Sequence, residues 1–104
     1  MKTTQVQNKK DLLYLLNLNK DSLQNFGVKR LGLFGSFVRD QATDESDIDF
    51  LIELPKERKT MRNLSDLYDF LSSVTGRNIE LVTPQSLSPY IGPKILKEVE
   101  YVFG

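Results

Sequence analysis

The chain has 104 residues, which suits one domain on the usual scale of about 100–200 residues per domain. Fourteen Lys and Arg balance fourteen Asp and Glu, so the chain lacks the broad basic field that drives strong nucleic-acid binding. It contains no Cys and no His, which excludes disulfides, thiolate chemistry and the commonest general base and transition-metal ligand. Carboxylates remain as the main candidates for acid–base chemistry or metal binding, and they favour Mg²⁺ or Mn²⁺.

No apolar run approaches the roughly 18 residues needed to span a bilayer, and the N-terminus lacks the apolar stretch of a signal peptide. We therefore expect a cytoplasmic protein without a membrane partner. Residues 1–104 are predicted to form a single domain, in which the polar residues 1–8 are disordered.

Two helices are predicted before residue 28. The leucines at positions 12, 13, 15 and 16 form an apolar helical face. Asn8 is placed to cap this helix, because its side-chain oxygen can accept a hydrogen bond from the first turn. A shorter helix over 21–26 would end at Gly27, since glycine readily adopts the left-handed C-cap conformation.

Two strands follow. Residues 28–34 read as a strand that leads directly into Gly35 and Ser36, after which residues 37–40 would open a helical turn. Residues 48–54 are predicted to form the second strand. Its side chains after Asp49 are nearly all apolar, which predicts a central strand covered on both faces.

The rest of the chain adds two helices and a third strand. An amphipathic helix closed by Gly76 is indicated by inward positions at Leu64, Leu67, Tyr68, Leu71 and Val74. A strand over 78–83 precedes a last helix that begins at Pro93 and faces inward with Ile95, Leu96 and Val99. This order of elements predicts an α/β fold, with a small mixed sheet of three to four strands and flanking helices.

Asp47 and Asp49 are spaced to share one face at the start of the second strand. Residues i and i+2 of a strand point to the same side, so both carboxylates can converge on a cation. Without a cation, two like charges beside an apolar strand repel each other. Taken alone, such a pair is more often plain solvation of a strand end.

Gly35, Ser36 and Arg39 suggest an anion site at the end of the first strand. Glycine lets the backbone approach a phosphate closely, and the N-terminus of a helix presents free N–H groups. The Ser36 hydroxyl adds a donor, and Arg39 could reach the same anion. A turn and a solvated surface arginine are the plainer interpretation of these residues alone.

Glu80 lies in the third strand between Ile79 and Leu81, so it must point away from the layer that those apolar residues bury. From an adjacent strand it could join Asp47 and Asp49. Its role would be to accept the proton of an attacking hydroxyl or to hold a second metal ion. An exposed strand glutamate is the alternative.

Read together, the segments 33–39, 46–50 and 79–83 resemble the minimal nucleotidyltransferases of the DNA polymerase beta superfamily. The spacing of Gly35-Ser36 and Arg39, followed by Ser46-Asp47 and Asp49, is far more specific than any single piece. The resemblance extends from about residue 28 to residue 99. It implies a small mixed sheet with flanking helices, in agreement with the predicted order of elements.

The resemblance also implies a chemistry. Gly35 and Ser36 would hold the triphosphate of ATP, Asp47 and Asp49 would bind two Mg²⁺ ions, and Glu80 takes the place of the third carboxylate. The chain departs from the family at Glu80, where Asp is commoner, and at Asp40, where the family commonly has Gly.

Many small members resemble antitoxins whose partner is a helical HEPN toxin, and the implied reaction is AMP transfer from ATP to a tyrosine hydroxyl of that toxin. The two departures leave open a second function, neutralisation by occlusion without catalysis. A third alternative is transfer to a small-molecule hydroxyl, for which a homo-oligomer would have to supply the missing wall of the site.

Overall fold

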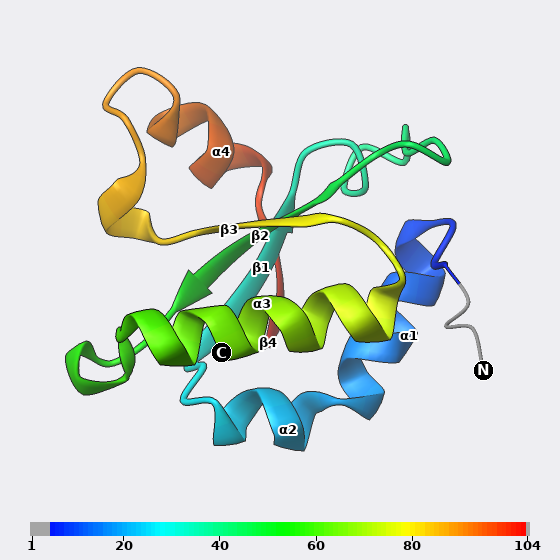
Figure 1. Cartoon of the computed structure of the whole chain (residues 1–104). Helices are drawn as coiled ribbons and strands as arrows, with labels where there is room; N and C mark the ends of the chain where they lie inside the picture. Colours follow the sequence, from blue (N-terminus) through cyan, green and yellow to red (C-terminus); the bar gives the residue numbers. More distant parts are fainter. Residues whose placement is uncertain (1–4, 104) are drawn as a thin grey trace.

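The computed structural model describes residues 5–103 and has four helices and four strands (Figure 1). The helices are α1 (Lys9–Leu18), α2 (Lys20–Asn25), α3 (Met61–Thr75) and α4 (Gly92–Glu98). The strands are β1 (Arg30–Phe34), β2 (Ile48–Glu53), β3 (Ile79–Val82) and β4 (Glu100–Phe103). Short 3-10 helices lie at Lys56–Arg58 and Pro84–Ser86. The predicted α/β fold is confirmed.

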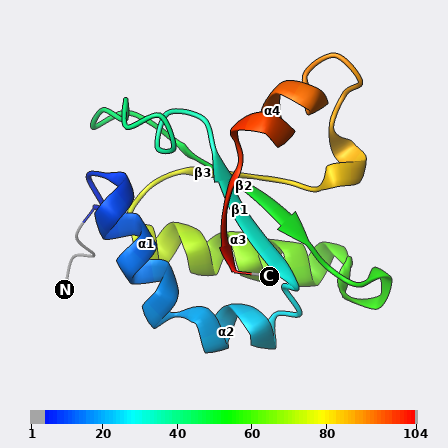
Figure 2. The same cartoon turned by 180° about the vertical axis from the view of Figure 1, so that it is seen from behind.

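The strands form one sheet in the order β3-β2-β1-β4. β1 pairs antiparallel with β2 and with β4, whereas β2 and β3 are parallel, so the sheet is mixed as expected. The parallel pair needs a crossover, which α3 provides. Helices α1, α2 and α3 cover one face of the sheet, and α4 lies on the other side (Figures 1 and 2).

The core lies between the sheet and the three helices. Alternate residues of the strands point into it, including Leu31 and Leu33 of β1 and Ile48, Phe50 and Ile52 of β2, all of them fully buried. The intervening positions, which include Asp49, therefore face the side of α4. The alternation of β2 thus sends its acidic residues, Asp49 and Glu53, out of the core.

The helix ends follow the predicted capping. Asn8 Oδ1 accepts a hydrogen bond from Asp11 N at 2.8 Å, and Gly76 ends α3 with a left-handed φ of 70°. The prediction that Tyr68 faces inward is wrong, because this residue is 40% exposed. It lies at the border of the apolar stripe, where a tyrosine can pack its ring and leave its hydroxyl in water.

β4 was missing from the predicted order of elements. The spacing of Ile95, Leu96 and Val99 suggested that the helix continues, but α4 ends at Glu98 and Val99 is its C-cap. Residues 100–103 then extend along β1 as an edge strand. Leu96, predicted to face inward, is 51% exposed. Short elements of four residues carry too little periodicity to reveal a strand.

The N-terminal prediction is also partly corrected. Residues 1–4 lie outside the described residues, but residues 5–8 are fixed in place rather than disordered. Val6 is only 8% exposed, and its N–H donates to Thr75 O at 3.0 Å. Across residues 5–103, each helix is too short or too polar to cross a membrane.

Candidate functional site

Asp49 and Glu80 lie side by side on neighbouring strands. β2 and β3 run parallel with Asp49 in register with Glu80, and residues in register point to the same face. The Glu80 carboxyl group is close enough to Asp49 to raise the pKa of Asp49. Glu80 is exposed and Asp49 is half-buried. Acidic residues of the two strands therefore lie close together, as the sequence predicted for Asp49 and Glu80.

The electrostatics of Asp49 reflect this crowding. Burial is the largest cause that raises the pKa of Asp49 from 3.8 to about 6, and the charge and hydrogen bond of Glu80 come next. Asp47 and Glu98 raise it further by their charges. A cation between these acids would relieve the repulsion, and an all-oxygen donor set suits a hard divalent ion such as Mg²⁺. The residues therefore fit the ion that the sequence predicts.

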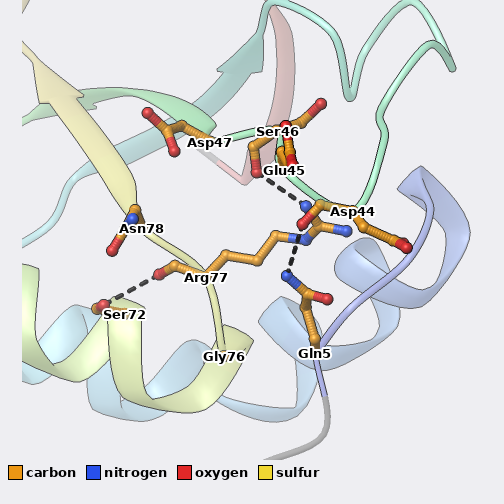
Figure 3. Close-up of a pocket in the computed structure, with 9 residues that line it drawn as sticks. All are labelled: Gln5, Asp44, Glu45, Ser46, Asp47, Ser72, Gly76, Arg77 and Asn78. Atoms are coloured by element: carbon orange, nitrogen blue, oxygen red, sulfur yellow. Dashed lines mark hydrogen bonds between the residues drawn. The ribbon is translucent and has the colours of Figure 1, made fainter.

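Asp47 does not complete a converged triad. Among residues 5–103, no group of three acidic side chains is gathered closely enough to form a ready-made metal site. Asp47 precedes the first residue of β2 and is exposed, so the strand geometry assumed in the prediction does not constrain its side chain. Figure 3 shows its carboxylate directed away from Arg77. Two of the three predicted acids are thus brought together, and the third lies nearby.

Gly35 fits tightly against Asp49. Its φ is 82°, and a Cβ built on it would lie 2.2 Å from Asp49 Oδ2. Only glycine adopts this left-handed backbone without strain while leaving room for the carboxylate. β1 and β2 are antiparallel and Phe34 is in register with Asp49, which explains the close approach. The position of Asp49, a predicted metal ligand, therefore requires glycine at position 35, which belongs to the predicted anion site.

Replacing Gly35 by Ala is expected to destabilise the fold by ~1–2 kcal/mol, because alanine is strained at positive φ. It should also push the Asp49 carboxylate aside and lower the nucleotidyl-transfer activity that the resemblance implies by ~10²-fold, the usual effect of misplacing a reacting group by about 1 Å. Urea denaturation and a steady-state rate assay measure the two effects. A variant with unchanged activity would show that the position of Asp49 is not critical.

The segment after Gly35 is a turn and not the start of a helix. Arg39 N donates to Gly35 O at 3.2 Å and Gln41 N donates to Ser36 O at 2.8 Å, and no helix follows. The predicted helix N-terminus is therefore absent within the described residues, and the donors toward an anion come from the turn itself. Ser36 is half-buried beside Gly35.

Arg39 turns toward Glu98. Its guanidinium forms an ion pair with Glu98, and Arg39 Nε donates to Gln41 Oε1 at 3.2 Å. Asp40 is exposed and has a left-handed φ of 59°. This backbone explains why glycine suits the position.

Replacing Asp40 by Gly is expected to change stability by less than ~1 kcal/mol, because relief of the left-handed strain offsets the greater entropy of the unfolded chain. Removal of one acid beside the anion site should tighten nucleotide binding modestly. Thermal denaturation and nucleotide titration measure the two effects. A loss of more than ~2 kcal/mol would contradict this account of the turn.

Glu98 is a site residue that sequence reasoning missed. At the end of α4, its Oε2 accepts a hydrogen bond from Gly35 N at 3.0 Å, and its Oε1 accepts from the Arg39 guanidinium. These contacts, led by the Gly35 N–H, lower the pKa of Glu98, although burial acts in the opposite direction. A single glutamate on an exposed helix gives no sequence signal for this role.

Arg77 was also missed. It is only 4% exposed, and its guanidinium lies over the ring of Phe37, 4.9 Å from the centroid. Arg77 Nε donates to Val6 O at 2.6 Å, and Nη1 donates at 2.8 Å to both Thr43 O and Ser46 O. Burial lowers its pKa. Arg77 therefore ties the N-terminal segment to the loop that leads into the acids.

A polar hollow of about 440 Å³ borders this arginine, next to Asp47 (Figure 3). The loop over 44–46 forms one wall, where Gln5 Nε2 donates to Asp44 O at 3.1 Å. The shape of the hollow and the path of the chain into Asp47 both depend on the hydrogen bonds of Arg77. A buried arginine that binds only carbonyls has no recognisable spacing in a sequence.

Solved structures share this fold. A protein described as a minimal nucleotidyltransferase matches with a TM-score of 0.79 over 90% of this chain and 95% of its own, at 23% identity. A complex of tri-AMPylated Shewanella oneidensis HEPN toxin with MNT antitoxin contains a chain that matches with a TM-score of 0.59, over 89% of this chain and 72% of that one, at 18% identity. At these identities the likeness concerns the fold.

Sequence comparison goes further. The protein adenylyltransferase MntA of Thermococcus cleftensis is 35% identical over 83 residues, which is 80% of this chain and 83% of the relative. The Nucleotidyltransferase domain family matches residues 15–102, a range that includes Gly35, the acids of β2 and β3, and Glu98. The chain therefore belongs to the nucleotidyltransferase domain family.

Proposed function

We propose that the protein transfers AMP from ATP to a tyrosine hydroxyl of a HEPN toxin and thereby acts as its antitoxin. The observation that carries the chemistry is the pairing of Asp49 with Glu80 on the face that holds the Gly35 turn. The protein adenylyltransferase relative and the AMPylated HEPN toxin in a complex of the same fold support the acceptor. Cytoplasmic ATP would supply the nucleotide.

The site residues divide into two groups under this proposal. Gly35, Ser36 and Arg39 bind the triphosphate. Asp49, with Asp47 after rotation of its exposed side chain, would hold Mg²⁺, and Glu80 beside Asp49 would accept the proton of the acceptor. When bound, Mg²⁺ neutralises phosphate charge and makes the attacking hydroxyl more acidic.

The reaction is a displacement at the α-phosphorus of ATP. The tyrosine oxygen forms a bond to that phosphorus, the bond to the bridging oxygen of the β-phosphate breaks, and pyrophosphate leaves. Glu80 is exposed at the border of the site, and its carboxylate accepts the proton of the tyrosine hydroxyl.

The test is incubation of the protein with ATP labelled at the α-phosphate, Mg²⁺ and its HEPN partner. The label should appear on the partner and should be lost with Asp47→Asn, while the exposed Asp69→Asn on α3 serves as the matched control. Replacing the acceptor tyrosine of the partner by Phe should also abolish labelling. Equal labelling by the Asp47→Asn variant would overturn the mechanism.

A second candidate function is neutralisation by occlusion, without transfer. Two observations favour it: within residues 5–103, Asp47 does not form a three-acid cluster with Asp49 and Glu80, and Glu98 holds the donors assigned to the triphosphate. An Asp47→Asn, Asp49→Asn double variant should then still protect cells from the toxin. Loss of protection, with the complex still forming, would exclude this alternative.

A further inference from the structure

The carboxylate of Glu98 lies where the proposed function needs an anionic phosphate oxygen. Glu98 is 63 residues from Gly35 in the sequence, and α4 brings the two together across the outer face of the sheet (Figure 2). One carboxylate oxygen of Glu98 accepts a hydrogen bond from the Gly35 N–H, and the other accepts from the Arg39 guanidinium. Its side chain is 24% exposed, compared with 51% for Arg39.

These contacts show that the turn binds an anion, and they also show a conflict. The backbone N–H of Gly35 is a single donor and cannot serve Glu98 and a phosphate oxygen at full strength together. A triphosphate placed beside an ionised Glu98 would also be repelled by it. The two contacts keep the carboxylate ionised, because they lower the pKa of Glu98. Nucleotide and Glu98 therefore compete for the same donors.

Little holds Glu98 in place apart from these donors. Within α4, only Gly92 is buried, and Leu96 is 51% exposed. β4 begins at Glu100 and is anchored to β1, so the backbone around Glu98 stays fixed while its flexible side chain can rotate. Rotation of one glutamate side chain is enough to free the Gly35 N–H and Arg39.

We propose that Glu98 acts as a gate on the triphosphate site: it occupies Gly35 N and Arg39 in the nucleotide-free protein, and ATP binds as Glu98 leaves them. The inference rests on the proposed function, because that function assigns these donors to the triphosphate. Glu98 thereby sets the affinity for nucleotide.

The test measures binding of a non-hydrolysable ATP analogue to the full chain by isothermal titration calorimetry, with Mg²⁺ present. Glu98→Gln keeps the size of the side chain but removes its charge, and we expect it to bind the analogue about tenfold more tightly, which is ~1.4 kcal/mol. The exposed Glu57→Gln is the matched control and should bind like the wild type. Adding Arg39→Met to Glu98→Gln should remove most of the gain, because the gain depends on a freed Arg39.

A folded Glu98→Gln variant, as judged by circular dichroism, that binds the analogue no more tightly than the wild type would overturn the gate. Glu98→Ala provides a second variant with the same expected direction if the Gln variant does not fold. If only the gate is wrong, the wild type still binds the analogue in the presence of Mg²⁺, and Gly35→Ala weakens that binding. Absence of binding in every protein would overturn the nucleotide site itself, and the proposed function with it.

Discussion

Replacing Asp49 by Asn is expected to lower the transfer rate by at least ~10³-fold, because it removes a charge from the centre of the proposed Mg²⁺ site. The same change should stabilise the metal-free protein. Asp49 is half-buried beside Glu80, and Gly35 packs against it, so its ionised form is unfavourable in the fold. The amide is similar in size and carries no charge. Activity and stability are therefore expected to change in opposite directions.

The stabilising effect has a defined pH dependence. The pKa of Asp49 is about 6 in the fold and near 3.8 in the unfolded chain, so the folded protein binds this proton more tightly. The stability that Asp49 contributes to the fold should therefore fall as the pH rises from about 3.8 to about 6, and it should stay constant at higher pH. The unscreened cost of ionisation is ~3 kcal/mol, which partial exposure reduces to ~1 kcal/mol. At neutral pH the Asp49→Asn variant should melt ~4–8 °C higher.

Thermal denaturation in a chelating buffer across this pH window measures the effect as the difference between wild type and variant. That comparison cancels groups of opposite sign, such as Glu98, whose pKa is lowered. Asp69→Asn on the exposed side of α3 is the control. Mg²⁺ should raise the melting temperature of the wild type and leave that of the Asp49→Asn variant unchanged. If the variant melted below the wild type at neutral pH, the charge repulsion around Asp49 would not limit stability.

Replacing Arg77 by Met is expected to destabilise the protein by ~3 kcal/mol, since hydrogen bonds from a charged donor contribute ~1.5–3 kcal/mol and the buried Val6 carbonyl would be left without this donor. The carbonyls of Val6, Thr43 and Ser46 would lose their donor together. Methionine can still cover Phe37 but cannot donate. This cost is a large fraction of the roughly 5–15 kcal/mol that holds a typical domain folded.

Urea denaturation followed by circular dichroism measures this loss. Arg62→Met, at an exposed position of α3, is the matched control and should stay within ~0.5 kcal/mol of the wild type. Arg77→Lys should fall between the two, because one ammonium group cannot reach carbonyls on both sides of a planar guanidinium. Equal stability of the Met and wild-type proteins would show that water replaces the arginine at these carbonyls.

Much of the fold could be predicted because periodicity and capping are local. Asn8 caps α1, Gly76 ends α3, and the apolar run of β2 lies at the centre of the sheet. β4 could not be predicted, because its four residues take their conformation from pairing with β1. The burial of Val6 likewise depends on Thr75, which lies far away in the sequence.

The site divides in the same way. The pairing of Asp49 with Glu80 follows from two strands whose patterns are readable, and the resemblance indicated that they are neighbours. Glu98 and Arg77 act through contacts that span 63 and 71 residues, and isolated charges of this kind usually mark a solvated surface. The strand geometry that was assumed for Asp47 does not apply, because β2 begins one residue after it.

The position of β3 at the rim of the sheet determines how an acceptor can enter. Because no further strand lies beyond β3 within residues 5–103, Glu80 stands at an open border. A folded protein can bring a side chain to Glu80 from the edge of the sheet, without any rearrangement of the strands. This open border would suit the macromolecular acceptor proposed above, because such a partner can cover the exposed side of Glu80 with its own surface.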